Sequence, residues 1–347
     1  MKIAFLIPSL ANQGPVLVAK DLVDQLVVKG HQCIVYYFDA IEEVNFPCTT
    51  QQITFFQKLP FQDYDVIHSH MFRPDLYCAY HVVFGGLNVK TISTIHTAID
   101  DDLKNAYGYL KSKLLPPLWK WSWSKMTHVV VLTEQAKKYY STLATKNEIL
   151  VINNGRDLPA EYDSIPTEDL AIINQLKKDY ILLGTVASFD KRKGLEQIVE
   201  LLSLHEKYAF LVIGHGIERQ PLEELAAKLG VSHRFRILGA RPQGFRYIPH
   251  FNIFVIPSRS EGLPLALLEA AAQHVPVVCS RIPVFEEIFD STQISFFELD
   301  NIPELTLACE NANLNGFIYS ANAYKKYMEN YTANKMCDNY LTVYGAN

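Results

Sequence analysis

The sequence predicts an α/β protein made of two Rossmann-like domains, each built on a parallel sheet, that face each other across a cleft. Three observations predict this fold. The 347 residues exceed the usual length of a single domain. Short β-branched runs alternate with helical patterns in two separate passages, which is typical of parallel sheets covered by helices on both faces. A polar, turn-rich stretch at residues 156–170 separates the two passages and resembles a linker.

The first domain is expected to span residues 1–160 and the second residues 161–322. In the first, apolar runs bounded by turn residues predict strands at residues 2–8, 32–39, 53–57, 65–70, 90–96, 128–133 and 149–155, with helices near 15–29 and 74–84, across 101–125 and from 134. In the second, strands at 180–188, 209–214, 235–239, 251–257 and 275–280 alternate with helices near 195–205, near 220–229 and from Pro264. An aromatic C-terminal helix at about 323–347 has no strand to follow, so we expect it to pack back onto the first domain.

Composition excludes several classes of protein. The chain is 49% hydrophobic and 20% charged, as in soluble globular proteins, and its net charge of −5 gives no overall attraction to nucleic acid. The six cysteines show no CxxC spacing, which favours free thiols over disulfides or a zinc site. The chain begins with a strand pattern rather than a signal peptide, and no apolar run reaches 18 residues. We therefore expect a cytoplasmic protein, or one attached peripherally to the inner face of the cytoplasmic membrane.

One stretch, "SRSEGLPLALLEAAAQHVPVV" at residues 258–278, carries the strongest functional signal. Its loop holds Glu261 and Gly262 where a parallel sheet's strand ends meet a helix start, and anions bind there because free N–H groups and the helix dipole favour negative charge. The backbone from Gly262 through Leu263 to Leu265 is expected to hold a phosphate. Glu269 lies in an apolar helix, so it needs partners such as the hydroxyls of a sugar or ribose.

"EGLPLALLE" resembles the Glu-x7-Glu motif of the retaining glycosyltransferases of family four, which have the GT-B fold. The resemblance extends over essentially the whole chain. It implies a hexosyltransferase-type reaction in which a sugar moves, with retained configuration, from a nucleotide diphosphate donor to a hydroxyl. UDP is the default nucleotide, and the acceptor is a glycan or lipid-linked saccharide of a bacterial envelope polysaccharide such as lipopolysaccharide or capsule. Glu261 would bind hydroxyls of the donor sugar and Glu269 the ribose, with no metal or other cofactor.

"TVASFDKRKGLEQIV" stands where that family carries a basic turn of the form Gly-Arg-x4-Lys-Gly. Lys193 and the glycine after it match, and a lysine ammonium can neutralise a diphosphate. Ser188 occupies the arginine position, so one cation of the family's donor site is missing unless Lys191 or Arg192 replaces it. The alternative interpretation of the turn, a charged surface loop, suits Lys191 and Arg192 better than it suits Lys193.

Other matches are partial. Gly214 and Gly216 match the family's Gly-x-Gly-x-Glu turn, although two glycines after a strand can equally serve a tight bend. Arg241 follows in the segment whose backbone meets the nucleobase in the family. In the first domain Gly14 matches one glycine of a Gly-Gly pair, and the resemblance assigns His96 to hydrogen bonding the transferred sugar.

Two histidines and three tryptophans remain in the first domain. His68 and His70 alternate along one strand, and because we find no third metal ligand they are interpreted as structural or cleft-lining. Trp119, Trp121 and Trp123 lie among Lys120 and Lys125, downstream of an apolar stripe at residues 103, 107, 110 and 114. We interpret Trp119 and Trp123 with these lysines as a membrane contact. The alternative is a helix that packs on the first sheet.

Two other functions remain open. A nucleotide-sugar epimerase of the same fold would need acid and base groups beside the sugar, and we find no convincing set. A catalytically silent nucleotide-sugar-binding module is kept open by Ser188.

Overall fold

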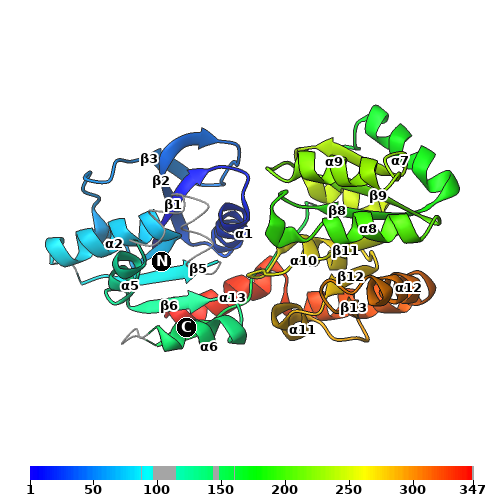
Figure 1. The fold of residues 1–347 in the computed structure, drawn as a ribbon. Helices are drawn as coiled ribbons and strands as arrows, with labels where there is room; N and C mark the ends of the chain where they lie inside the picture. The colour runs from blue at the N-terminus through cyan, green and yellow to red at the C-terminus, as the bar shows by residue number, and fades with distance from the viewer. Residues whose placement is uncertain (87, 97–114, 144–147, 160, 346–347) are drawn as a thin grey trace. The chain divides into compact units, whose positions relative to one another are not determined.

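The computed structural model describes residues 1–86, 88–96, 115–143, 148–159 and 161–345. The chain divides into two compact units (Figure 1). Unit 1 comprises residues Met1–Arg156 and Asn330–Asn347, and unit 2 comprises Asp157–Glu329.

Unit 1 is built on a parallel sheet of strands in the order β3-β2-β1-β4-β5-β6-β7. The strands are β1 (Lys2–Leu10), β2 (Gln32–Glu42), β3 (Thr49–Gln52), β4 (Val66–His70), β5 (Lys90–Ile95), β6 (His128–Val131) and β7 (Ile149–Val151). The central strand β4 is buried along its whole length, as expected where helices cover both faces of a parallel sheet. The order of the strands reverses between β1 and β4, which is the point where ligands bind in this architecture.

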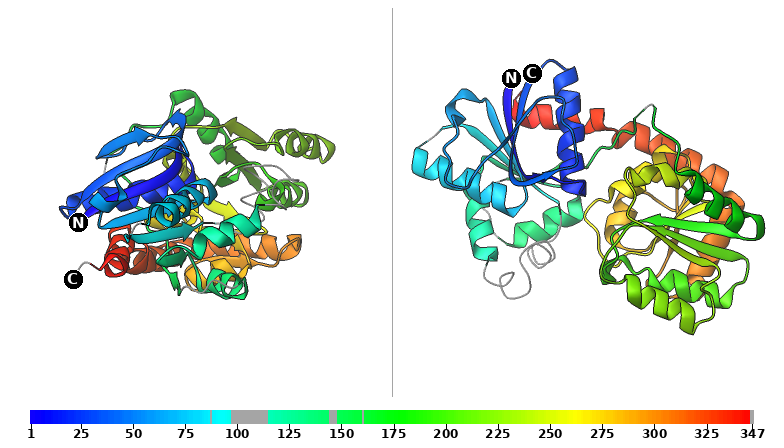
Figure 2. Two further views of the ribbon diagram at one scale, coloured as in Figure 1. Left: turned by 90° about the vertical axis from the view of Figure 1, so that its left-hand side faces the viewer. Right: turned by 90° about the horizontal axis from the view of Figure 1, so that it is seen from above.

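Two groups of helices cover this sheet (Figure 2). Helices α2 (Phe72–Gly85), α5 (Pro116–Trp123) and α6 (Glu134–Thr142) contribute to a core with one face of the strands. Helix α1 (Gly14–Val28) packs beside the C-terminal helix α13 (Ala333–Tyr344). Local signals explain the starts: Pro15 lies in the first turn of α1, and the Thr133 side chain caps α6 by accepting from the backbone N–H of Ala136 at 3.1 Å.

Unit 2 carries a second parallel sheet with the order β10-β9-β8-β11-β12-β13. Its strands are β8 (Ile181–Val186), β9 (Tyr208–Ile213), β10 (Phe235–Gly239), β11 (Ile253–Ile256), β12 (Val277–Ser280) and β13 (Ser295–Phe297). Its helices are α7 (Thr167–Asp179), α8 (Glu196–Leu204), α9 (Arg219–Lys228), α10 (Leu265–Ala272), α11 (Pro283–Ile288) and α12 (Ile302–Asn330). Residues of α8, α9 and α12 form one core with the sheet. The strand order reverses between β8 and β11.

The structure corrects the third predicted strand. Residues 53–57 lie outside any strand, and β3 is instead the preceding segment Thr49–Gln52. All four of its residues are exposed, so this edge strand shows no apolar pattern. The apolar run that follows supplies Ile53 and Phe55 to the core below it.

The membrane contact predicted for the tryptophans is wrong. Trp119 and Trp123 are each only 1% exposed. Their indole Nε1 atoms donate to Asp75 Oδ2 at 2.7 and 3.1 Å, beneath α2. These two rings are therefore part of the unit 1 core and cannot insert into a bilayer. Of the two lysines beside them, Lys120 is half-buried and Lys125 is exposed. The apolar stripe upstream, at residues 103–114, lies outside the described residues.

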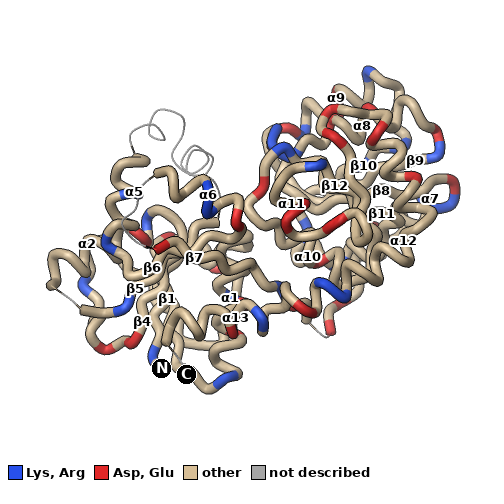
Figure 3. The backbone as a smooth tube through the Cα atoms, turned by 90° about the horizontal axis from the view of Figure 1, so that it is seen from below, with Lys and Arg blue, Asp and Glu red and all other residues tan. Residues whose placement is uncertain are grey.

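Figure 3 shows basic and acidic positions interspersed along the backbone of each unit. Within the part of the chain that the structure describes, every helix is too short or too polar to cross a lipid bilayer.

Candidate functional site

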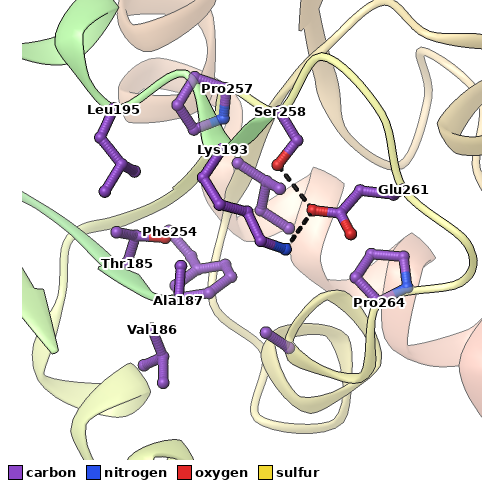
Figure 4. Close-up of a pocket in the computed structure, with 12 residues that line it drawn as sticks. Thr185, Val186, Ala187, Lys193, Leu195, Phe254, Pro257, Ser258, Glu261 and Pro264 are labelled. Carbon is purple, nitrogen blue, oxygen red and sulfur yellow. Dashed lines mark hydrogen bonds and ion pairs between the residues drawn. The ribbon is translucent and has the colours of Figure 1, made fainter. Parts of the chain in front are cut away.

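A pocket opens in unit 2 where β8 and β11 end, at the reversal of strand order (Figure 4). It contains about 290 Å³ of empty space, part of it open to solvent. Residues from the ends of these strands, from the loops that follow them and from the start of α10 line it: Thr185, Val186, Ala187, Lys193, Leu195, Phe254, Ile256, Pro257, Ser258, Glu261, Pro264 and Ala266. Two predicted site residues, Lys193 and Glu261, therefore lie in one pocket.

Glu261 and Lys193 form an ion pair in this pocket. Lys193 Nζ lies 2.6 Å from Glu261 Oε1, and the same oxygen accepts from Ser258 Oγ at 2.7 Å (Figure 4). The Glu261 side chain is 6% exposed and that of Lys193 is 15% exposed. A charge-assisted hydrogen bond in such a sheltered place is stronger than on the open surface. The pocket thus presents a cation and a carboxylate side by side, each able to exchange its partner for a ligand group.

The backbone fixes the position of Lys193. Residues Lys191–Lys193 form a 3₁₀ turn that ends at Gly194, whose φ of +61° is in the left-handed region. A Cβ at Gly194 would stand 2.2 Å from the carbonyl oxygen of Pro257. Gln197 Nε2 donates to the carbonyls of both Gly194 and Pro257, at 3.1 and 3.0 Å. The loops after β8 and β11 are therefore held together, which brings residues distant in sequence to one pocket.

Arg192 reaches the Glu261 loop, whereas Ser188 does not. Arg192 Nη1 donates to the Ser260 carbonyl at 3.1 Å and lies 3.5 Å from Glu261 Oε2. Ser188 Oγ instead donates to Asp190 Oδ2 at 2.9 Å. Lys191 is exposed, on the same turn. Of the two cations considered as replacements for the missing arginine, only Arg192 approaches the carboxylate of the pocket.

The remaining predicted residues of this loop surround the pocket rather than line it. Leu265 is the first residue of α10, and its neighbours Pro264 and Ala266 face the pocket. Leu263 is 4% exposed and Glu269, on α10, is 7% exposed. Glu269 is thus a buried carboxylate on an otherwise apolar helix, as predicted, but its assignment to a ribose stays a prediction.

Gly214 and Gly216 serve a tight bend against the loop after β8. Their φ angles are +143° and +155°. Cβ atoms at these positions would lie 1.9 Å from the Ala187 carbonyl oxygen and 2.4 Å from that of Phe189. The two glycines therefore let their turn press on the segment that supplies Ala187 to the pocket.

Arg241 is engaged in an ion pair away from the pocket lining. Its Nε and Nη2 atoms donate to the two carboxylate oxygens of Asp169 at 2.7 and 3.0 Å. The Tyr247 hydroxyl also donates to Asp169, at 2.5 Å. The Arg241 hydrogen bonds lower the pKa of Asp169, followed by that from Tyr247. This arrangement anchors the first turn of α7, and the contact of Arg241 with a nucleobase stays a prediction.

In unit 1 the two predicted residues follow β1, at the reversal of strand order, and β5, the neighbour of β4. Gly14 begins α1, and a Cβ there would meet open space. His96 follows β5, is 6% exposed, and its Nε2 lies 2.8 Å from His70 Nδ1. Burial lowers the pKa of His96 to about 3. The local geometry therefore does not require glycine at position 14. His96, by contrast with a lone surface histidine, is held in a hydrogen-bonded pair with His70.

Sequence reasoning missed Ser258 and Thr185. Both occur in or just after a strand that ends at the pocket, and Ser258 donates to Glu261 three residues later. A hydroxyl next to the strand end was the available signal, but serine is too common in loops for that signal to be specific. Among the described residues, no three His, Cys, Asp or Glu side chains are grouped so as to hold a metal ion.

Comparison with known proteins agrees with this geometry. Residues 13–159 match the family model described as Glycosyltransferase Family 4, and residues 167–305 match that described as Glycosyl transferases group 1. The O-antigen biosynthesis glycosyltransferase WclY of Escherichia coli is 29% identical over 353 aligned positions, which cover 99% of this chain and 98% of that protein. The lipopolysaccharide core biosynthesis glycosyltransferase LpsE of Rhizobium meliloti is 29% identical over 44% of each chain.

Solved structures show the same fold. Sucrose-phosphate synthase from Thermosynechococcus elongatus aligns with a TM-score of 0.80 at 16% identity, covering 100% of both chains. HepE of Anabaena, in complex with UDP-glucose, aligns with a TM-score of 0.78 at 15% identity, again over 100% of both chains. The two matched family models, the two Rossmann-like sheets and these neighbours together identify the chain as a glycosyltransferase with the GT-B fold.

Proposed function

We propose that this chain is a retaining hexosyltransferase that moves a sugar from a UDP-sugar to a hydroxyl of a glycan or lipid-linked saccharide, in the synthesis of O-antigen or a related lipopolysaccharide. The similarity to the E. coli O-antigen enzyme over nearly the whole chain supports the pathway. The neighbour in complex with UDP-glucose supports the donor class. A lipid-linked acceptor would place the reaction at a membrane surface.

One observation carries the proposal: the ion pair of Lys193 and Glu261 in a pocket beside the start of α10. As the sugar leaves, negative charge grows on the diphosphate, and Lys193 with the N–H groups at the helix start would stabilise it. Glu261 would accept hydrogen bonds from hydroxyls of the donor sugar, and Glu269 would bind the ribose. These roles need no metal ion, so we expect transfer in the presence of a chelator.

The resemblance to a retaining family favours retention of configuration, and the way Glu261 is held is compatible with a mechanism that needs no enzymatic nucleophile. It is the one carboxylate among the residues lining the described pocket, and both Lys193 and Ser258 donate to its Oε1. A carboxylate oxygen with two donors is a weak nucleophile for a sugar carbon. We therefore propose attack on the face that the diphosphate leaves: the acceptor oxygen bonds to the anomeric carbon, the bond from that carbon to the phosphate oxygen breaks, and the acceptor's proton passes to the leaving phosphate.

The first test identifies the donor. UDP-, GDP- and ADP-sugars are screened for their effect on the melting temperature, because a ligand that binds only the folded state raises it. The stabilising sugar nucleotide is then incubated with lipid-linked saccharides from an O-antigen-producing bacterium. Nucleotide release that depends on the acceptor, with a product whose anomeric proton coupling matches that of the donor, is the expected result.

Other outcomes decide among the alternatives. An inverted anomeric centre would overturn the retaining mechanism. An isomerised sugar in the absence of acceptor would indicate an epimerase, and tight binding with no release under any condition would indicate a silent module. Lys193→Ala should lose binding, whereas Lys191→Ala, on the same turn but exposed, serves as the matched control.

A further inference from the structure

Three histidines gather in unit 1 where β4 and β5 end. His68 and His70 lie on β4 and are fully buried, and His96 follows β5 with 6% of its surface exposed. The rings of His70 and His96 stack with centroids 5.1 Å apart and planes 24° apart. A hydrogen bond of 2.8 Å joins His70 Nδ1 to His96 Nε2.

Burial favours the neutral form of both rings of this pair. Burial lowers the pKa of His96 to about 3 and that of His70 well below its usual value, where the nearby histidines add to the effect. A neutral imidazole has one N–H donor and one acceptor nitrogen. One of the two bonded nitrogens must therefore donate and the other accept.

The surroundings of His70 decide which one donates. His70 Nε2 is buried and has no hydrogen-bond partner in the described structure. Buried N–H groups without an acceptor are rarer in native proteins than acceptors that lack a donor. The proton of His70 therefore belongs on Nδ1, where it is donated to His96 Nε2. With its Nε2 accepting, His96 must carry its own proton on Nδ1.

We propose that His70 is a positioning residue that holds His96 as the Nδ1–H tautomer, so that His96 offers an N–H donor to an oxygen of the bound saccharide. The saccharide part rests on the proposed function; the tautomer does not. His68 provides the contrast on the same strand: its Nδ1 contacts the Tyr344 hydroxyl at 2.7 Å and its Nε2 contacts Thr94 Oγ1 at 2.8 Å. With both nitrogens bonded to other groups, His68 makes no hydrogen bond to His70 or His96.

Nitrogen NMR of the histidine-labelled protein tests the tautomer without any substrate. Long-range ¹H–¹⁵N correlations distinguish a protonated from a bare ring nitrogen, and the signals lost in His96→Gln assign His96. We expect His96 with a bare Nε2 in the parent protein and in His70→Asn, because the asparagine amide keeps a donor near the position of Nδ1. We expect a mixture of tautomers in His70→Leu, and no change in the control His68→Gln. A protonated Nε2 on His96 in the parent protein would overturn the proposal.

Kinetics test the consequence. We expect His70→Leu to lower kcat/KM for sugar transfer by about tenfold, an effect of about 1.4 kcal/mol, while UDP affinity stays within about twofold. His70→Asn should retain activity to within about threefold. Equal losses in the two variants would show that packing, not the donated proton, matters, and would also overturn the proposal. If the parent protein transfers no sugar, the proposed function fails, and the NMR result still decides the tautomer.

Discussion

Lys193 and Glu261 form an ion pair, and we expect them to act on UDP affinity in opposite directions. Their charged atoms are 2.6 Å apart, and at an effective dielectric constant of about 20 their attraction is roughly 6 kcal/mol before desolvation is subtracted. A diphosphate that binds Lys193 must compete with this attraction. Lys193 therefore contributes to UDP binding only the difference between its bond to phosphate and its bond to Glu261.

Lys193→Ala removes the cation, and a hydrogen bond to a charged group contributes about 1.5–3 kcal/mol. We expect UDP to bind about 10- to 100-fold more weakly in this variant. Glu261→Gln is nearly isosteric and removes the competing charge but leaves an oxygen that can accept from Ser258. In this variant we expect UDP affinity to be unchanged or to rise by up to about fivefold. The preference for UDP-sugar over UDP should fall, because the sugar hydroxyls lose their strong acceptor.

Titration calorimetry with UDP and with the UDP-sugar at fixed ionic strength measures these effects, since surface charge contributions vary with salt. Lys191→Ala controls for the loss of one positive charge on the same turn. If Glu261→Gln weakened UDP binding as much as Lys193→Ala did, the two residues would bind the diphosphate as a unit. The separate assignment of diphosphate to Lys193 and sugar to Glu261 would then be refuted.

Three further predictions follow from the contacts described above. Arg192→Ala should weaken UDP about three- to tenfold by calorimetry while Lys191→Ala has no effect, since only the arginine approaches the pocket carboxylate; equal effects would contradict the role of Arg192. Asp75→Ala should lower the free energy of urea unfolding by about 3–5 kcal/mol because it leaves buried donors unpaired, whereas Trp123→Phe should cost about 1 kcal/mol beyond its packing loss. Burial lowers the pKa of His68 in the folded protein to about 3. As the pH falls below 6.5, His68 is therefore protonated in the unfolded chain but not in the folded one. Through this group the free energy of unfolding should fall by about 1.4 kcal/mol for each unit that the pH decreases. His68→Gln should make this decrease less steep when unfolding is measured from about pH 7 to pH 5.

The positions of the site loops could be predicted from the sequence, but the contacts between them could not. β-Branched runs fix where β8 and β11 end, and residues just after such strands in a parallel sheet face the ligand side. Strand ends predicted this position for Glu261 and the family resemblance predicted it for Lys193, and both residues line one pocket. That Lys193 bonds Glu261, 68 residues later, depends on the close approach of Gly194 to Pro257, which no local pattern encodes.

The tryptophans show how a composition signal fails. The periodicity of a helix tells which side chains share a face, but not what lies beneath that face. Asp75 precedes Trp119 by 44 residues, and only the packing of α5 on α2 brings its carboxylate under the indoles. Ser69 and Ser93 also donate to this carboxylate, at 2.6 and 2.8 Å. Burial raises the pKa of Asp75 to about 6 against the effect of these hydrogen bonds. An amphipathic tryptophan needs a polar partner for its N–H, and a buried carboxylate can supply it as well as a membrane surface can.

The same reasoning explains why the end of the chain belongs to unit 1. Thr94 Oγ1 contacts the Tyr340 hydroxyl at 2.8 Å, and His68 contacts that of Tyr344. Two tyrosines of α13 therefore supply hydrogen-bond partners to buried polar side chains on β4 and β5. Without α13 these strand residues would lose their buried partners, each at a cost of about 1–3 kcal/mol. The core of unit 1 is therefore incomplete without residues 330–347, which follow unit 2 in the sequence. His68 and His70 share strand β4, so α13 packs against the strand whose end carries His70. The predicted site in unit 1 thus depends on the last residues of the chain, whereas the pocket of unit 2 is assembled within residues 185–266.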